Sequence, residues 1–303
     1  MDVENRIPEF LCDILEKQYG AEILKTIIQG YKQDRMLTFR ANTIKTTTNA
    51  VQDELLQAGI VFEKVPWYDQ AFILNKEQDQ YLRTLRVYEE GEIYLQSLSS
   101  MLPPIWLDPK PGESILDMAA APGSKTTQIA ALSQNKAPIT ACEKNAIRAE
   151  RLKYNLQKQG VTSAYVMVID ARQLDNLFSF DKILLDAPCS GSGTIQEEDI
   201  NLEKRFTKQL IDKSILVQFA LLKKAINLLK PGGELIYSTC SILGCENEEV
   251  IKKALISTKT EIVPIDSEIT RYLPLLPTTL QGTIAVCPNQ WFEGFFIAKL
   301  RKY

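Results

Sequence analysis

Two cysteines follow apolar runs in short segments rich in small polar residues, and a thiol in such a place can act as a nucleophile. Cys189 lies in DAPCSGSG (186–193), and Cys240 lies in STCS (238–241). A buried cysteine is usually a small apolar core residue, so two cysteines in matching positions carry more weight than either alone. The chain has no histidine, which excludes a Ser-His-Asp or Cys-His pair within it.

A thiolate beside a methyl sulfonium would suit methylation of cytosine carbon 5. That carbon is a poor nucleophile, but addition of a thiolate at carbon 6 makes the ring enamine-like, so that carbon 5 can attack the methyl group. Loss of the carbon 5 proton and expulsion of the thiolate complete the reaction. Such a site needs a nucleophilic cysteine, an acid near ring N3 and a group that assists elimination. Asp186, Lys125 and the second cysteine could supply these roles.

The segment DMAAAPGSKT (117–126) is rich in small residues and leads into a predicted helix. Small residues let a ligand approach the backbone closely, and a helix N-terminus offers free N–H groups. A nucleotide-triphosphate loop needs adjacent Gly and Lys and a Gly upstream, whereas Ser124 separates Gly123 from Lys125, and GxGxxG is also absent. The segment therefore favours an adenosyl ligand without phosphates, with a turn chosen for packing as the alternative.

Acidic residues end the next two predicted strands. Glu143 ends the strand 137–143 and could accept hydrogen bonds from ribose hydroxyls, while Asp170 ends the strand 164–170 and could meet an adenine amino group. The alternative for Glu143 is an exposed carboxylate at a helix N-cap, and a similar alternative applies to Asp170.

Strands and helices alternate in the second two thirds of the chain, which predicts a doubly wound, mostly parallel α/β sheet. The predicted strands are 114–118, 137–143, 164–170, 182–188 and 234–240, and the predicted helices are 124–132, 146–159, 202–229 and 246–256. Two final strands, within 282–288 and 294–300, suggest an antiparallel addition at one edge. Because ligands bind at the carboxyl ends of parallel strands, both cysteine segments should lie beside the adenosyl site.

The first third of the chain has a different pattern. Residues 8–30 carry apolar residues at helical spacing, and 37–95 alternate short strands and helices in a small α+β unit. A linking helix over 98–107 should be broken by Pro103 and Pro104. The expected domains are an N-terminal helical segment (1–34), a small α+β subdomain (35–100) and a ligand-binding domain (101–303).

The bulk properties restrict the partners and the compartment. The net charge of −3 argues against a broadly basic surface, so any nucleic acid must contact local basic patches. The N-terminus lacks the features of a signal peptide, and no apolar run is long enough to span a membrane. None of the six cysteines forms a CxxC pair, so free thiols and no metal are expected. A cytoplasmic monomer is the expectation.

Three segments resemble the central motifs of the RNA 5-methylcytosine methyltransferases, the Fmu/Sun group. These segments are LDMAAAPGSKTT (116–127), LLDAPCSGSGTI (184–195) and YSTCSILGCENEEV (237–250). The segment FRANT (39–43) is similar to that family's N-terminal RxNT motif, and Tyr94-Leu95-Gln96 and the closing GFFIAKL also fit. The resemblance covers residues 37–300 in the right order, and the pairing of a PC motif with a TC motif is highly specific.

The resemblance implies a Rossmann-like methyltransferase domain preceded by an RNA-recognition-like subdomain. It implies that Cys240 is the nucleophile, that Cys189 helps to break the covalent enzyme–RNA bond, and that Asp186 contacts the cytosine with Lys125 nearby. The residues that it places in an S-adenosylmethionine pocket are Ala119, Ala120, Ala121, Pro122, Gly123, Ser124, Lys125, Glu143, Arg148, Asp170 and Asp186. One departure is Ala119, where many members carry cysteine, at a position not expected to be catalytic.

The function that these features predict is methylation of cytosine carbon 5 in transfer or ribosomal RNA, with S-adenosylmethionine as cofactor. DNA cytosine methyltransferases use the same chemistry with the PC cysteine as nucleophile, so the TC cysteine favours RNA. A second alternative is a non-catalytic RNA-binding or ribosome-assembly factor that retains the fold, against which the intact motifs argue. A third is a small-molecule methyltransferase, but ordinary N- or O-methylation needs no thiol beside the cofactor.

Overall fold

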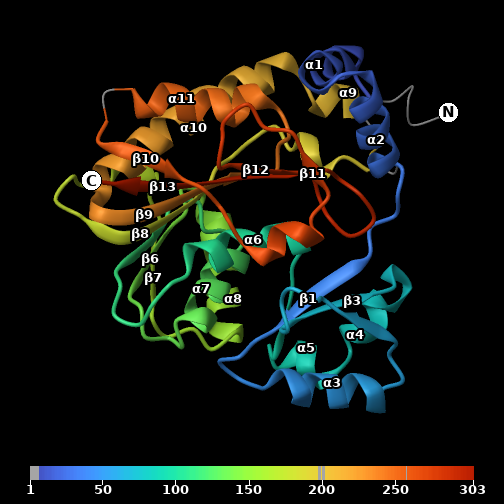
Figure 1. The fold of residues 1–303 in the computed structure, drawn as a ribbon. Helices are drawn as coiled ribbons and strands as arrows, with labels where there is room; N and C mark the ends of the chain where they lie inside the picture. The colour runs from blue at the N-terminus through green and yellow to red at the C-terminus, as the bar shows by residue number, and fades with distance from the viewer. Residues whose placement is uncertain (1–6, 197–198, 200–201, 257) are drawn as a thin grey trace.

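The computed structural model describes residues 7–196, 199, 202–256 and 258–303, in two sheets joined by a central helix (Figure 1). Residues 1–6 of the predicted N-terminal segment lie outside this description. The smaller sheet is antiparallel, in the order β2 (Phe62–Lys64), β3 (Ala71–Leu74), β1 (Leu37–Ala41), β4 (Ile93–Leu95). Three helices cover one of its faces: α3 (Thr48–Gln57), α4 (Asp79–Leu82) and α5 (Arg86–Glu89).

Alternation along the strands decides which side chains of the small sheet face these helices. Phe39 and Phe72 are cross-strand partners with ring centroids 5.0 Å apart, and both are buried with Val51 and Leu55 of α3. Because successive strand residues point to opposite faces, the neighbouring Arg40 points away from this core. It reaches the larger sheet unit instead, where its Nη2 donates to Thr127 Oγ1 at 2.8 Å. The α+β character predicted for this region is confirmed.

The larger sheet has the order β11-β12-β13-β9-β8-β5-β6-β7, and β10 also pairs with β13. Its parallel strands are β5 (Ile115–Asp117), β6 (Ile139–Cys142), β7 (Ala164–Met167), β8 (Phe180–Asp186) and β9 (Leu229–Thr239). Its antiparallel strands are β10 (Thr260–Val263), β11 (Leu275–Leu276), β12 (Ile284–Val286) and β13 (Phe295–Lys302). The predicted Rossmann-like sheet with an antiparallel edge is confirmed. The strand order reverses between β5 and β8, which makes their carboxyl ends the expected ligand site.

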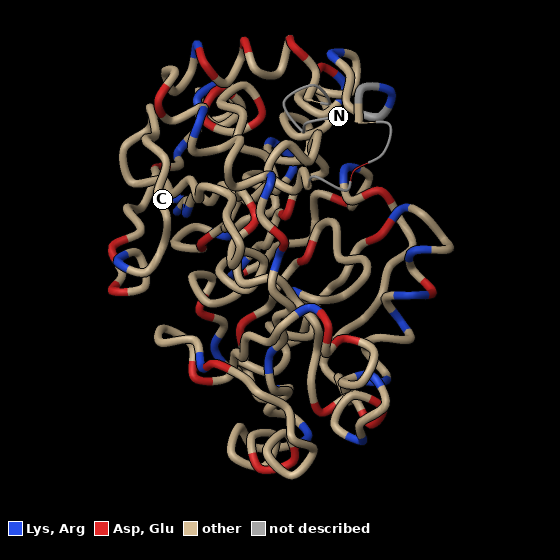
Figure 2. The backbone as a smooth tube through the Cα atoms, turned by 90° about the vertical axis from the view of Figure 1, so that its right-hand side faces the viewer, with Lys and Arg blue, Asp and Glu red and all other residues tan. Residues whose placement is uncertain are grey.

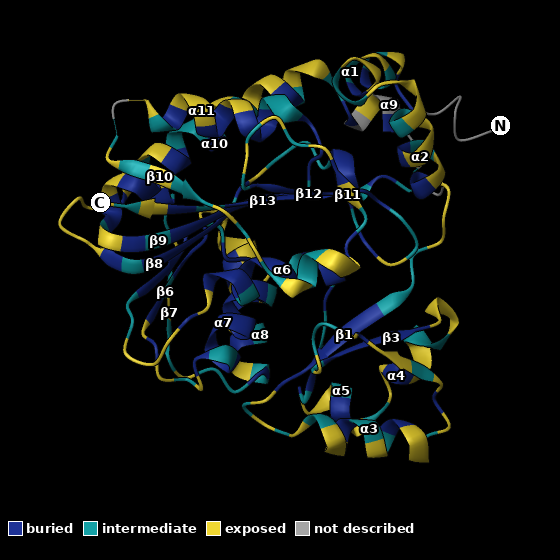
Figure 3. Ribbon diagram, viewed as in Figure 1, coloured by how far each residue is buried: buried dark blue, intermediate teal, exposed yellow. Residues whose placement is uncertain are grey.

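Helices cover both faces of this sheet, which explains the continuous apolar run in β8. Ile183 and Leu185 pack with one group of helices, whereas Leu184 packs with the other (Figures 1 and 3). The first group contains α1 (Glu9–Tyr19), α2 (Ala21–Tyr31), α9 (Leu202–Arg205), α10 (Lys208–Leu228) and α11 (Glu248–Leu255). The second contains α6 (Leu98–Leu107) and α7 (Ser124–Leu132), with α8 (Ala146–Lys158) beside them. None of the described helices is long and apolar enough to span a membrane.

Two details of the helix predictions were wrong. Helix α6 is continuous through Pro103 and Pro104. Pro104 cannot donate to the carbonyl of Ser100, but Gln96 Nε2 donates to that carbonyl at 2.9 Å, and burial of most of the helix stabilises the remainder. The single helix predicted over 202–229 is divided into α9 and α10, because Thr207 Oγ1 accepts the N–H of Leu210 and caps a new helix.

The N-terminal helices α1 and α2 pack on the larger sheet unit, with Leu15 and Ile27 in its core. The Tyr31 hydroxyl donates to the carbonyl of Ser192 at 2.6 Å, in the loop that follows β8. These helices therefore brace the loops at the carboxyl edge of the sheet. The division of the chain at residues 34 and 100 stays a prediction.

Candidate active site

The structure brings the two cysteine segments together at the carboxyl edge of the sheet. Strands β8 and β9 are parallel neighbours, with Asp186 opposite Ser238, so the loops that follow them start side by side. In these loops Cys189 Sγ lies 3.2 Å from Cys240 Sγ, and both cysteines are half-buried. The thiols are therefore in contact with each other and partly open to solvent.

Lys125 and Asp186 form an ion pair beside the thiols. Lys125, in the first turn of α7, places its Nζ 2.7 Å from Asp186 Oδ2 and donates to Ser100 Oγ of α6. Ser238 donates to Asp186 Oδ1 at 2.8 Å, which orients the carboxylate. Burial alone would lower the pKa of Lys125, but the charge and hydrogen bond of Asp186, with further contributions from Cys240 and Asp117, outweigh it and raise that pKa. Lys125 is therefore a permanent cation in the site.

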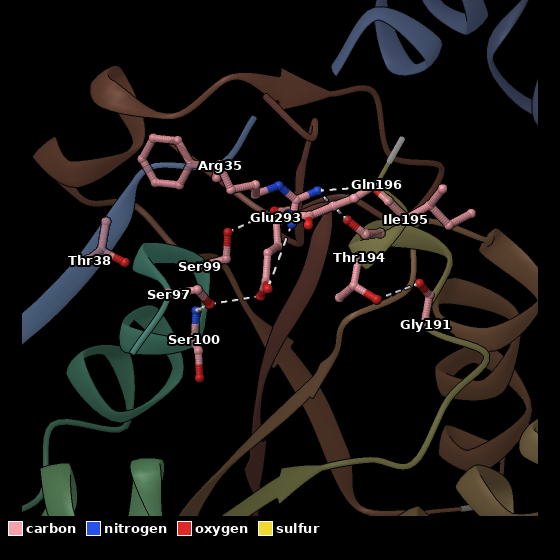
Figure 4. Close-up of polar contacts among 12 residues, drawn as sticks. Arg35, Thr38, Ser97, Ser99, Ser100, Gly191, Thr194, Ile195, Gln196 and Glu293 are labelled. Carbon is pink, nitrogen blue, oxygen red and sulfur yellow. Dashed lines mark hydrogen bonds and ion pairs between the residues drawn. The ribbon is translucent and has the colours of Figure 1, made fainter. Parts of the chain in front are cut away.

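A network around Arg35 and Glu293 connects the loop that follows β8 with the start of α6 (Figure 4). Arg35 donates to the carbonyl of Gly193 at 3.3 Å and lies 3.6 Å from the Glu293 carboxylate. The other Glu293 oxygen accepts a hydrogen bond from Ser97 Oγ at 2.7 Å, at the start of α6. The network thus ties the loop that follows Cys189 to the helix that carries Ser100.

A cleft lies at the carboxyl ends of β5, β6 and β7, next to the cysteine loops. Four residues of the predicted pocket line it: Ala119, Glu143, Arg148 and Asp170. Its other walls are Met118, Lys144, Ile169, Ala171, Arg172, Pro188, Val217 and Leu221. Pro188 precedes Cys189, so the cleft and the thiol pair are contiguous.

Glu143 is buried at the end of β6, and the N-cap of α8 is Asn145, so Glu143 is not the exposed N-cap considered above. Its carboxylate accepts the N–H of Asn145 at 2.8 Å and lies 3.4 Å from Arg148 Nη1. A buried carboxylate at the cleft has oxygens available for ribose hydroxyls, and the apolar cleft walls suit a purine ring. The residues present therefore fit S-adenosylmethionine.

Asp170 lines the cleft, but its carboxylate is engaged by its neighbour. Both of its oxygens accept hydrogen bonds from the Arg172 guanidinium, at 2.9 and 2.6 Å. The Arg172 hydrogen bond lowers the pKa of Asp170 below its usual value. Asp170 is thus ionised, and Arg172 shares its position at the cleft.

The rest of the predicted pocket does not line the cleft. Ala121 accepts a hydrogen bond from Arg148 Nη2 at 2.7 Å through its carbonyl. Gly123 has a φ of 112°, a left-handed conformation that favours glycine, and caps α7. The described residues that line the cleft do not include Ala120, Ala121, Pro122, Gly123 or Ser124, while Lys125 and Asp186 lie in the thiol cluster instead.

Sequence reasoning missed several members of the site. Val217 and Leu221 line the cleft from α10, four residues apart, and their pattern is that of any core-facing helix. Arg172 stands two residues after Asp170 in the sequence, a spacing that could have suggested their contact. Asp117, at the end of β5, is buried, and burial raises its pKa to about 6. No metal-binding group of three or more His, Cys, Asp or Glu side chains occurs in the described part of the chain.

Comparisons with known proteins agree with this geometry. The family described as "16S rRNA methyltransferase RsmB/F" matches residues 104–301, and a ferredoxin-like domain of the same kind of protein matches residues 7–80. Two similar relatives are ribosomal RNA small subunit methyltransferases F. The one from Shewanella amazonensis is 37% identical and covers 88% of this chain, and the one from Shewanella loihica is 38% identical and covers 88%. This chain spans only 58% and 56% of their lengths.

Solved structures give the same fold. A methyltransferase homologue from Pyrococcus horikoshii has a TM-score of 0.83 and 34% identity, covering 98% of this chain and 100% of that one. The archaeal NSun6 from the same organism has a TM-score of 0.85 at 24% identity over 98% of each chain. The chain is thus of the S-adenosylmethionine-dependent methyltransferase class. Within that class it belongs to the 16S rRNA methyltransferase RsmB/F family.

Proposed function

We propose that this chain methylates carbon 5 of cytosine in RNA, through a covalent bond between Cys240 Sγ and carbon 6 of the base. The observation that carries the proposal is the 3.2 Å contact between Cys240 and Cys189 beside a cleft that fits S-adenosylmethionine. A methyltransferase for oxygen or nitrogen would need no such pair of thiols next to its cofactor.

Each group near the thiols has a role in this reaction. The Cys240 thiolate adds to carbon 6, and Asp186 contacts the polar edge of the base at ring N3, with its carboxylate oriented by Lys125 and Ser238. S-adenosylmethionine, when bound, supplies the methyl group that carbon 5 receives. A base then takes the carbon 5 proton, the bond between Cys240 and carbon 6 breaks with its electron pair returning to the sulfur, and Cys189 assists this bond breaking. Glu143 binds the ribose hydroxyls, and Arg148 and Asp170 complete the cofactor site.

The family favours ribosomal RNA of the small subunit as the substrate, with transfer RNA as the alternative. Figure 2 shows Lys and Arg positions interspersed with Asp and Glu along the backbone, which argues against one large basic surface and leaves RNA contact to local basic groups. RNA binding should therefore weaken as the salt concentration rises, even though the part of the protein that the structure describes has no large basic surface. We also propose, from the sequence alone, that the protein is a monomer and is located in the cytoplasm.

The test uses tritiated S-adenosylmethionine with small-subunit ribosomal RNA and transfer RNA, followed by bisulfite sequencing of the product. We expect 5-methylcytosine with wild type and a loss of at least about 10³-fold with Cys240→Ala. Cys189→Ala should accumulate a covalent RNA adduct, seen as a retarded band on a denaturing gel. Activity that survives Cys240→Ala but not Cys189→Ala would reverse the two roles. Methylated RNA without 5-methylcytosine would refute the proposal.

A further inference from the structure

A buried carboxylate that the proposed reaction does not use ties the two cysteine loops together. Glu246 is fully buried at the end of the 3₁₀ turn Gly244–Glu246. Its Oε1 accepts the N–H of Ser190 at 2.7 Å, and its Oε2 accepts the hydroxyls of Ser190 at 2.5 Å and Ser241 at 2.6 Å. Because Ser190 follows Cys189 and Ser241 follows Cys240, one carboxylate holds both loops.

The groups around Glu246 are those that an ionised carboxylate requires. Besides the two serines, Gln218 Nε2 approaches Oε1 at 3.4 Å, so both oxygens face donors. Leu243 donates its N–H to Ser241 Oγ, which leaves the Ser241 hydroxyl free to donate to the carboxylate. None of the ion pairs among the described residues involves Glu246. Burial raises the pKa of Glu246, whereas the hydrogen bonds from Ser190, Ser241 and Gln218 oppose that rise and favour the anion.

This anion and the Lys125 cation act on different members of the thiol pair. Contact with the Cys240 sulfur, burial and the charge of Glu246 raise the pKa of Cys189 well above that of an ordinary thiol. Lys125 interacts electrostatically with Cys240 instead. Tyr237 also faces Cys189 and Glu246, but its pKa is raised well above 10 by burial, so it is neutral.

Cys245 is a further titratable group beside Glu246. Burial raises its pKa to about 11, so it too is neutral at pH 7. The charge of Glu246 therefore acts on Cys189, while Lys125, which is ion-paired with Asp186 at 2.7 Å, acts on Cys240. A proton shared by the pair has lower free energy near the anion than near the cation.

We propose that Glu246 is a positioning residue that holds the two cysteine loops in register and keeps the proton of the pair on Cys189, so that the thiolate forms at Cys240. The Cys189 S–H then faces the Cys240 sulfur across 3.2 Å. For catalysis this inference rests on the proposed function, because it explains which thiol is the nucleophile. The distribution of the proton itself can be measured without any RNA or cofactor.

The test is site-resolved alkylation of the full chain by iodoacetamide over about pH 6 to 10, with each cysteine peptide quantified by mass spectrometry, because only the thiolate reacts. In wild type we expect Cys240 to react at lower pH than Cys189. Glu246→Gln removes the charge but can keep the contacts, since the serine hydroxyls can accept from the amide. It should lower the pH midpoint of Cys189 alkylation by about 1 unit, the size of one neighbouring charge.

Three further variants distinguish the effect of charge on thiol reactivity from an effect of disturbed folding. Glu246→Asp keeps the charge and should leave the Cys189 midpoint closer to wild type than Glu246→Gln does. Glu248→Gln, at a buried carboxylate two residues away, is the matched control and should leave it unchanged. Lys125→Met removes the opposing cation and should slow Cys240 alkylation at pH 7 by about tenfold; it tests the charge asymmetry even if Glu246→Gln fails to fold.

An unchanged Cys189 midpoint in folded Glu246→Gln would overturn the inference, as would wild-type Cys189 reacting before Cys240. If Glu246→Gln is unfolded, unchanged Cys240 reactivity in Lys125→Met would overturn it. These results do not depend on whether the chain methylates cytosine, so the inference and the proposed function can fail separately.

Discussion

Strand β8 contributes a charged residue to an ion pair near each of its two ends, and the residues that surround the two pairs differ. At its carboxyl end Asp186 pairs with Lys125 at 2.7 Å. At its amino end Lys182 pairs with Glu234 of β9 at 2.8 Å. In both pairs the side chains are largely buried. The chemistry and geometry of the two contacts are thus nearly the same.

Their neighbours are not the same. Glu234 receives two further cations, Lys299 at 3.0 Å and Arg301 at 2.7 Å, so its charge is more than balanced. Among the residues that the structure describes, Asp186 pairs with one cation, Lys125, whose charge also acts on Cys240. A buried ion pair is weak evidence of function by itself. Two features therefore distinguish the carboxyl end of β8 as the candidate active site. Titratable thiols lie beside its ion pair, and the direction of the parallel strands places ligands at this end.

The largest difference should appear when each lysine is replaced by methionine. Lys125→Met removes the cation beside the thiols and the orientation of Asp186, and we expect kcat for RNA methylation to fall by about 10²-fold. Lys182→Met at the other end should lower thermal stability but keep kcat within about twofold of wild type. The measurement is steady-state methylation alongside thermal unfolding of both variants. Equal losses of kcat in the two variants would contradict the claim that only the ion pair at the carboxyl end of β8 contributes to catalysis.

A smaller effect, on the free energy of unfolding, is expected when the charge of Glu234 at the amino end of β8 is removed. Burial alone would raise the pKa of Glu234, but hydrogen bonds from Lys182, Arg301 and Lys299 hold it at about 2, below its usual 4.5. The carboxylate therefore contributes stability that is present above pH 4.5 and lost as the pH falls toward 2. We expect Glu234→Gln to lower the free energy of unfolding by about 2 kcal/mol at pH 7.

Denaturant unfolding of Glu234→Gln and wild type at a series of pH values tests this. The difference in free energy should shrink as the pH falls below about 4.5. A difference that stays constant down to the acid limit of the fold would mean that the loss is one of packing, not of charge. Methylation by the folded variant should be unchanged, which distinguishes this end from the other.

Much of the architecture could be predicted from sequence because it depends on local patterns. The strand β8 follows from the apolar composition of 182–188, and the family motifs place both thiols at one edge of the sheet. The continuity of α6 could not be predicted, since the carbonyl of Ser100 finds its donor in Gln96, outside the helix. The predicted break at Pro103 and Pro104 therefore did not take into account the hydrogen bond from Gln96 that replaces a missing backbone donor.

The site shows the same division. Cys189 and Cys240 were identifiable by residue type, but the role of Glu246 depends on its contact with Ser190, 56 positions away in the other cysteine loop. An acidic residue in a polar segment has no sequence signal that distinguishes burial from exposure. The contact of Asp170 with Arg172 is different, because the two residues are two positions apart and that spacing could have suggested it. Contacts between distant loops are thus what sequence patterns omit.

The smallest effect concerns the surplus of cations at Glu234. Arg301 is nearly half exposed, whereas Lys182 and Lys299 are more buried. Removing an exposed partner costs little when two others remain, so Arg301→Ala should lower the free energy of unfolding much less than Glu234→Gln does and leave methylation unchanged. Equilibrium unfolding at low and high salt measures it, with Arg271→Ala, at an exposed pair, as the control. A loss as large as that of Glu234→Gln would mean that the three cations act as one unit, and that the amino end is as dependent on a single cation as the carboxyl end is on Lys125.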